Sequence, residues 1–211
     1  MPRIPYASSG QLRETLGRSP FPDDTHPGGV FRMLAHTPPL GAAALALIYA
    51  VLSDSELDPC LREIVILRVA ERSRAPYAFS QHSAIATSVG VDAAQVSSLA
   101  AGATPDELFD HRARAAVAFV DETLEGSQAS GQTWRLAVQH FSPRQMVELL
   151  LTAGCFRMMS RLVSILELET EPSFGVDTLR RARDAAEQGN EANGRAGRAG
   201  FRSAGCPVAP A

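Results

Sequence analysis

Residues 58–82 carry the sequence DPCLREIVILRVAERSRAPYAFSQH, which predicts two consecutive helices. Asp58 stands before Pro59 as an N-cap stands before a proline at the first helical position, so a helix should begin there and end near Arg72. After a short break, a second helix is predicted over residues 77–89. Because helices joined by so short a break are commonly antiparallel neighbours, we expect their apolar faces to meet.

Helical periodicity continues outward from this pair, and no long stretch alternates apolar and polar residues as a strand would. Further helices are predicted over residues 38–52, 92–102, 110–124, 133–141 and, after the Ser142–Pro143 cap, 143–169. The last of these is apolar almost all round, so it should be either the central helix or part of a subunit interface. The predicted fold is therefore all-α, a single-domain helical bundle that forms oligomers.

The two ends of the chain differ in composition from the helical body. Residues 1–28 are rich in Pro, Gly, Ser and Asp and predict an arm that lies over the body or over a neighbouring subunit. The helical domain is predicted over residues 29–188, including an amphipathic segment at 176–187. Residues 189–211 are rich in Gly, Ala, Arg and Pro, a composition that predicts a disordered tail.

Composition excludes several classes of function. The 211 residues, 45% of them hydrophobic, suffice for one core, and a net charge of −3 gives no reason to expect nucleic acid as a partner. All 20 basic residues are arginine, so a lysine Schiff base is excluded. The longest apolar run, residues 40–52, is shorter than the roughly 20 residues that cross a membrane, and the N-terminus has no apolar signal core. We therefore expect a cytoplasmic protein without membrane contact.

The cysteines indicate neither a disulfide framework nor a metal centre. Cys60, Cys155 and Cys206 are widely spaced, and the chain contains no C-x-x-C pair and no zinc-like cluster of cysteine and histidine. No metal and no cofactor is expected. Cys60 lies in the first turn of a predicted helix, where the helix dipole lowers the pKa of a thiol. It is either a reactive thiol beside the candidate site or a small buried side chain.

Two titratable residues occupy helix faces that should be apolar, and they are the candidate catalytic residues. The same-face neighbours of Glu63 are Cys60, Ile66, Leu67 and Ala70, and those of His82 are Ala78, Phe79, Ile85 and Ala86. An apolar site that holds one carboxyl and one imidazole is suited to proton transfer. Alternatively, Glu63 and His82 form a structural pair, or His82 bonds a backbone carbonyl. Gln81 is predicted to face away from them.

Four further residues are candidates for substrate binding. Arg157 and Arg161 form a polar stripe with Ser160 and Ser164 on the long helix, and two guanidinium groups could hold a carboxylate or enolate. The alternative is that this stripe faces solvent or acidic residues of another subunit. Tyr77 and Phe79 either line the pocket, with Tyr77 as a hydroxyl donor, or belong to the core.

The segments 61–67 (LREIVIL) and 77–82 (YAFSQH) resemble the carboxymuconolactone decarboxylase and AhpD-like family. Residues 141–149 (FSPRQMVEL) and 154–166 are similar to that family's closing helices, and the resemblance spans about residues 30–169. It implies an all-helical fold and a homo-oligomer, a trimer or hexamer with a dimer as a further option. The family includes lactone decarboxylases and thiol-dependent hydroperoxide reductases.

The chain departs from both branches of this family at the expected site. The peroxidase branch has a C-x-x-C motif where this chain has Ala75 and Ala78, so a dithiol cycle is unavailable there. The decarboxylase-like branch resembles Tyr-Glu-Trp where this chain has Tyr77, Ala78 and Phe79, which removes an acidic group. Arg157 and Ser164 stand where that branch is expected to have asparagines.

The resemblance implies a cofactor-independent enzyme of the decarboxylase-like branch. His82 would move a proton, and Glu63 would orient the His82 imidazole. The arginines would hold a developing enolate or carboxylate. The substrate would be a small oxygenated carboxylate, lactone or carbonyl compound, and the reaction a decarboxylation, isomerisation or lactone/enol rearrangement in specialised metabolism. The alternative is a non-catalytic oligomeric protein that binds a ligand or regulates, and a third hypothesis is a hydroperoxide reductase that depends on Cys60.

Overall fold

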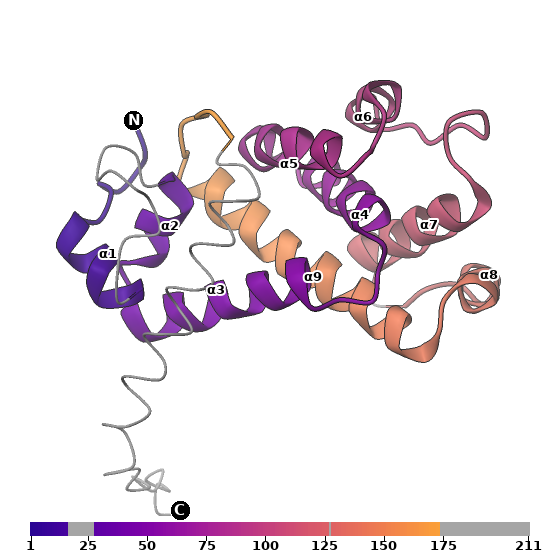
Figure 1. Ribbon diagram of the computed structural model, residues 1–211, viewed down its shortest axis with the longest axis horizontal. Coiled ribbons are helices and arrows are strands. Elements are labelled where there is room, and N and C mark those ends of the chain that lie inside the picture. The colour runs from indigo at the N-terminus through magenta and orange to yellow at the C-terminus, as the bar shows by residue number, and fades with distance from the viewer. Residues whose placement is uncertain (17–27, 127, 174–211) are drawn as a thin grey trace, which may run out of the picture.

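The computed structural model describes residues 1–16, 28–126 and 128–173, and every regular element in these ranges is an α-helix (Figure 1). The helices are α1 (Ser9–Leu16), α2 (Gly29–Leu34), α3 (Pro38–Ser53), α4 (Pro59–Arg72), α5 (Pro76–Ser88), α6 (Ala93–Ala100), α7 (His111–Glu125), α8 (Gly131–His140) and α9 (Pro143–Ile165). The predicted all-α fold is confirmed. The segments predicted over residues 176–187 and 189–211 lie outside the described residues.

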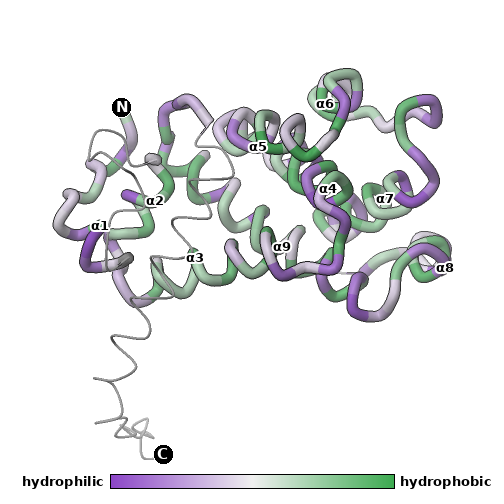
Figure 2. Tube along the Cα trace, viewed as in Figure 1, coloured by the Kyte–Doolittle hydropathy of each residue, from purple (hydrophilic) through white to green (hydrophobic). Residues whose placement is uncertain are grey.

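The centre of the bundle is α4, which contacts α5, α6, α7 and α9. Every residue from Leu61 to Ala70 is buried. The long apolar helix α9 has, by contrast, an exposed outer face that includes Val147, Leu151 and Ile165. Hydrophobic stretches mark α3, α4, α7 and α9 in Figure 2. The central position that the sequence offered to α9 is therefore taken by α4.

Local signals set the bounds of α4 and α5. The Asp58 side chain accepts hydrogen bonds from the backbone N–H groups of Cys60 and Leu61, as the predicted N-cap requires. At the other end Arg74 adopts a left-handed conformation with φ of 51°, and the Ala75 amide donates to the Ala70 carbonyl. This turn ends α4 and lets α5 pack along it.

The last helix ends earlier than the apolar pattern predicts, at Ile165 instead of residue 169. Glu167 has φ of 54°, and the Leu168 amide donates to the Val163 carbonyl at 3.0 Å. A left-handed residue with such a bond terminates a helix, which a count of apolar positions cannot detect. Residues 166–173, here called the strap, then run back toward α2 and α5, and the Arg3 side chain holds Glu167.

The N-terminal helices pack on the body through α3. Leu12 of α1 is 2% exposed, and α1 and α2 both contact α3. The two helices α2 and α3 meet through the backbone at Gly41, where an added Cβ would collide with the Leu34 carbonyl oxygen. Val30 and Phe31 of α2 border the same cavity as Tyr77 and His82 of α5.

In the described ranges, no helix combines the length and the apolar character that crossing a lipid bilayer requires.

Candidate active site

The candidate catalytic pair is joined by a hydrogen bond between His82 Nδ1 and Glu63 Oε2 at 2.8 Å. Glu63 is 0% exposed and His82 is 9% exposed. The His82 ring also lies edge-on to Phe156 of α9, with ring centroids 4.8 Å apart. These contacts fix the imidazole from two sides, and no residue in the described part of the chain has a recorded hydrogen bond to Nε2.

The second carboxylate oxygen of Glu63 lies opposite a buried arginine. Glu63 Oε1 and Arg62 Nε are 4.0 Å apart, and neither atom has a hydrogen-bond partner among the described residues. Burial lowers the pKa of Arg62 below its usual range. The guanidinium therefore supplies positive potential near the carboxylate without a hydrogen bond to it.

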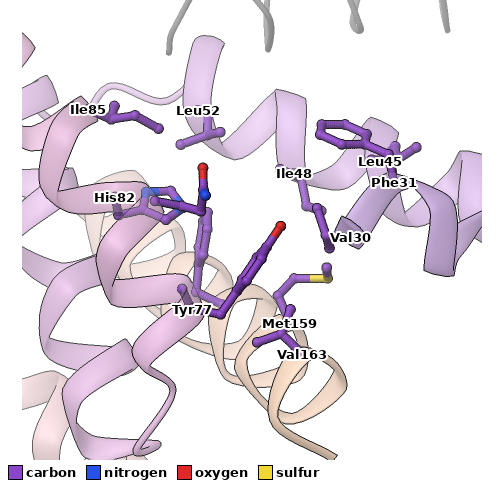
Figure 3. A pocket seen from close by; sticks show the side chains of 13 residues that line it. Val30, Phe31, Leu45, Ile48, Leu52, Tyr77, His82, Ile85, Met159 and Val163 are labelled. Atoms are coloured by element: carbon purple, nitrogen blue, oxygen red, sulfur yellow. The ribbon is translucent and has the colours of Figure 1, made fainter. Parts of the chain in front are cut away.

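A cavity opens beside His82. Its volume is about 80 Å³. The cavity is lined by Val30, Phe31, Leu45, Ile48, Leu52, Tyr77, Ala78, Gln81, His82, Ile85, Phe156, Met159 and Val163. Figure 3 shows residues of α2, α3, α5 and α9 around it. One hollow thus brings the imidazole of α5 together with side chains from three other helices.

The strap is bonded to the two polar residues that lie beside His82 in this lining. The Tyr77 hydroxyl donates to Glu171 Oε1 at 2.5 Å, and the Gly29 amide donates to the same oxygen at 2.7 Å. Gln81 Nε2 donates to the Glu171 carbonyl at 2.8 Å, and the Ser173 hydroxyl donates to the Gln81 carbonyl at 3.0 Å. Burial, followed by the bond to Glu171, raises the pKa of Tyr77 above its usual range.

Tyr77 is therefore the one predicted substrate-binding residue that the structure brings to the cavity. Phe79 packs, half-buried, against the hydrophobic core and is absent from the lining. Of the two positions that the sequence left open for Phe79, the structure therefore shows the one in the core.

The two arginines of the long helix do not reach the cavity. Arg157 lines a separate shallow hollow with Thr123 and Leu150, and Arg161 is exposed. The hypothesis that they grip a carboxylate beside His82 is thus not supported. The reason is helical geometry, since Phe156, Met159 and Val163 take the inner face of α9 and leave the arginines on its outer side.

Cys60 likewise lies away from His82. Its thiol donates to the Val89 carbonyl at 2.8 Å and borders a different hollow, one that also contains Asp110 and Arg112. Desolvation, together with the negative charge of Asp58, raises the pKa of Cys60, contrary to the lowering expected from the helix dipole. The N-cap carboxylate beside the thiol is the charge that the dipole argument omitted.

Two residues of the site were missed by the sequence reasoning. Gln81 was predicted to face away from His82, yet it is 5% exposed and lines the cavity. Glu171 was not considered, because nothing local in its sequence connects it with residues about 90 positions earlier. The strap explains both omissions, since it covers a face of α5 whose sequence is polar and which therefore suggests contact with solvent. In the described part of the chain, no group of three histidine, cysteine or acidic residues could hold a metal ion.

Comparisons with known proteins agree with this architecture. Residues 38–122 match the family model described as the carboxymuconolactone decarboxylase family. No curated protein sequence matches the chain.

Solved structures show the same fold. The AhpD core protein from Ralstonia eutropha JMP134, described as peroxidase-related, has a TM-score of 0.64 and 16% identity over 86% of this chain and 96% of its own. A peroxidase-related protein from Silicibacter sp. TM1040 has a TM-score of 0.61 and 19% identity over 68% and 76% of the two chains.

A third similar structure is a variant of the debrominase Bmp8 in complex with 2,3,4-tribromopyrrole, with a TM-score of 0.61. It is 18% identical and covers 84% of this chain and 89% of its own. Identities this low carry the fold and nothing finer. The chain therefore contains a region similar to the carboxymuconolactone decarboxylase family, within a fold that it shares with AhpD-like proteins.

Proposed function

We propose that this protein is a cofactor-independent enzyme in which His82 moves a proton to or from a small molecule held in the cavity. The observation that carries the proposal is the buried hydrogen bond from His82 to Glu63 at the wall of a cavity. Such a pair, set in an apolar hollow, is the arrangement that general acid–base catalysis needs. The family model that residues 38–122 match also takes its name from a decarboxylase.

The geometry gives each member of the pair a distinct part. When Glu63 is ionised, its Oε2 accepts the Nδ1–H proton, so the neutral imidazole offers the lone pair of Nε2. Nε2 then takes a proton from a C–H or O–H bond of the guest, and Glu63 stabilises the resulting imidazolium. The proton returns to a different atom of the same molecule. This cycle is an isomerisation or an enol rearrangement and needs no oxidant or reductant.

The test is exchange of hydrogen for deuterium in a panel of small ketones, lactones and enolisable compounds dissolved in D₂O, followed by proton NMR. The wild-type protein should catalyse exchange in at least one member. His82→Ala and Glu63→Gln should each slow that exchange by about 100-fold or more, because they remove the base or its orienting partner. His36→Ala is the matched control, since His36 is exposed and bonds the Pro5 carbonyl.

Helicity by circular dichroism and elution volume should be unchanged in all three variants. Full exchange by either His82→Ala or Glu63→Gln would exclude the proposed roles. If exchange needs the protein but is equally fast in the His82→Ala and Glu63→Gln variants, another residue is the base.

A second candidate function is ligand binding without catalysis. It is favoured by the apolar lining of the cavity and by Ala78, which stands where the related decarboxylase-like sequences are expected to have an acidic residue. This second function predicts a small molecule that stays bound through purification, and no catalysed exchange in any compound of the panel. The Cys60 hydroperoxide reductase has no such support, because that thiol is bonded to Val89 and lies outside the cavity.

A further inference from the structure

The cavity contains no charged side chain that could accompany an ionic guest. Of its lining residues, ten are apolar and the others are Tyr77, Gln81 and His82. The arginines of α9 lie elsewhere, as described for the site. A carboxylate placed here would lose its hydration without gaining a permanently charged partner among the lining residues. This argues for a neutral guest.

Gln81 turns its amide donors toward the strap. Its Nε2 donates to the Glu171 carbonyl at 2.8 Å and lies 3.4 Å from the Pro172 carbonyl. These two carbonyls take both of the N–H bonds that an amide group possesses. Gln81 therefore brings no donor to a guest.

Glu171 decides which way the Tyr77 hydroxyl bonds. Glu171 Oε1 already accepts from the Gly29 amide, a group that can only donate, so this oxygen acts as an acceptor toward Tyr77 as well. The single hydroxyl proton of Tyr77 is thereby committed to the strap. Burial and the Glu171 carboxylate both favour the protonated phenol and raise its pKa. The Val30 backbone amide also bonds the Tyr77 oxygen, which opposes this rise in the pKa, so what Tyr77 offers to the cavity is its remaining lone pair.

His82 is an acceptor in the same sense. Its Nδ1–H is bonded to Glu63, which leaves the Nε2 lone pair when the ring is neutral. In Figure 3 the rings of Tyr77 and His82 stand on the same side of the cavity, across from Leu52 and Ile48 of α3. Two acceptors thus face one apolar space into which no donor of Gln81 or Tyr77 points.

We propose that this cavity selects a neutral, mainly apolar guest of about one ring that carries an acidic O–H or N–H group, and that Glu171 is the positioning residue that makes Tyr77 accept from it. The part played by His82 rests on the proposed function, whereas the part played by Tyr77 rests on Glu171 alone. Carboxylates, one of the three classes of substrate that the family resemblance implies beside lactones and carbonyl compounds, fall outside this class.

The test compares the binding of phenol, anisole and benzoate to the full chain by isothermal titration calorimetry at neutral pH. Phenol is neutral and donates, anisole is neutral and cannot donate, and benzoate is an anion of similar size. Phenol should bind at least about tenfold more tightly than anisole, which corresponds to one hydrogen bond of about 1.4 kcal/mol. Benzoate should not bind at concentrations that saturate with phenol.

Variants separate the positioning role of Glu171 from mere support of the strap. Glu171→Ala should free the Tyr77 hydroxyl to donate, so the preference for phenol over anisole should fall toward equality. Glu171→Gln keeps an acceptor oxygen at the same place and should retain the preference. Glu169→Ala is the matched control, because it removes a carboxylate of the same strap that has no bond to Tyr77 or Gln81.

The proposal is overturned if benzoate binds as well as phenol, if phenol fails to bind at millimolar concentration, or if Glu171→Ala keeps the full preference. These measurements are of equilibrium binding and do not depend on turnover. Exchange that is lost in the His82 and Glu63 variants, together with binding that shows no preference, would uphold the proposed function and reject this inference. A preference for phenol over anisole, without any catalysed exchange, would uphold this inference and reject the proposed function.

Discussion

The carboxylate of Glu63 is fully buried, yet only one of its oxygens accepts a hydrogen bond from the described residues. Its nearest cation, Arg62, stays 4.0 Å from the other oxygen. A buried anion with so few partners destabilises a fold, since two or three hydrogen bonds are normally needed to offset its desolvation. This loss of stability is explained if Glu63 is retained for chemistry at His82.

Burial also sets the pKa of the two cysteine thiols in the described part of the chain. Desolvation and the charge of Asp58 raise the pKa of Cys60, and desolvation raises that of Cys155 to about 11. The thiolate is the reactive form, so at pH 8 about one Cys155 side chain in a thousand is reactive.

We therefore predict slow alkylation of Cys60 and Cys155 by iodoacetamide in native protein at pH 8, measured by mass spectrometry in a Cys206→Ser background. The rates should rise as the pH increases, because a raised pKa moves the thiolate population to higher pH. Protein unfolded in guanidinium is the reference in which both thiols should react quickly. Labelling of Cys60 at equal rates in both states would contradict the burial described for it.

At the scale of the helix, α4 buries two arginines that are held in different ways. Arg68 forms a bidentate pair with Asp121 at 2.8 and 2.7 Å and also bonds Glu71 at 3.0 Å. Arg62 is equally buried, but its closest carboxylate lies beyond hydrogen-bond distance. Bidentate charged bonds contribute to stability, whereas a buried charge without them is close to neutral or unfavourable.

Arg68→Met should consequently lower the free energy of unfolding by about 2 kcal/mol, because it removes the bidentate pair and leaves Asp121 with only the more distant Arg72, at 3.7 Å. Arg62→Met should change that free energy by less than about 1 kcal/mol, since it removes no hydrogen bond seen among the described residues. Urea denaturation followed by circular dichroism measures both. Equal losses in the two variants would mean that Arg62 has a partner beyond those described.

The helices around the site show why only part of it was predictable. The N-cap at Asp58 and the apolar faces around Glu63 and His82 are local signals, and they suffice to bring the pair together. Gln81 could not be assigned, because the strap that covers it comes from a distant part of the chain. Arg157 was proposed as a binding residue from the polar stripe on its helix, a pattern that does not tell which side of the helix meets the cavity, and the packing of α9 turns it outward.

For the whole molecule, the outer face of α9 is the surface that remains to be explained. Exposed apolar side chains at positions 151, 158 and 165 follow a seven-residue spacing, Val147 lies four residues before the first of them, and Gly154 lies among them with open space around it. This repeat is typical of a seam between two helices. The spacing supports our proposal that the protein is a homo-oligomer, with a second copy of this chain covering α9.

We expect light scattering coupled to size-exclusion chromatography to give a mass of at least two chains at micromolar concentration. Leu151→Glu combined with Met158→Glu should reduce that mass to one chain without loss of helicity, because charges would enter the apolar seam. Thr87→Glu, at an exposed position on α5, serves as the control. A wild-type protein of monomeric mass would disprove the proposal.

The contact at Gly41 has a consequence for how this cavity can change over evolutionary time. Since α2 meets α3 there through the backbone, any atom added at Gly41 pushes away the helix that carries Val30 and Phe31 of the cavity wall. Adaptation to guests of other sizes is therefore open through the side chains that line the cavity, while the glycine is held in place by the architecture itself.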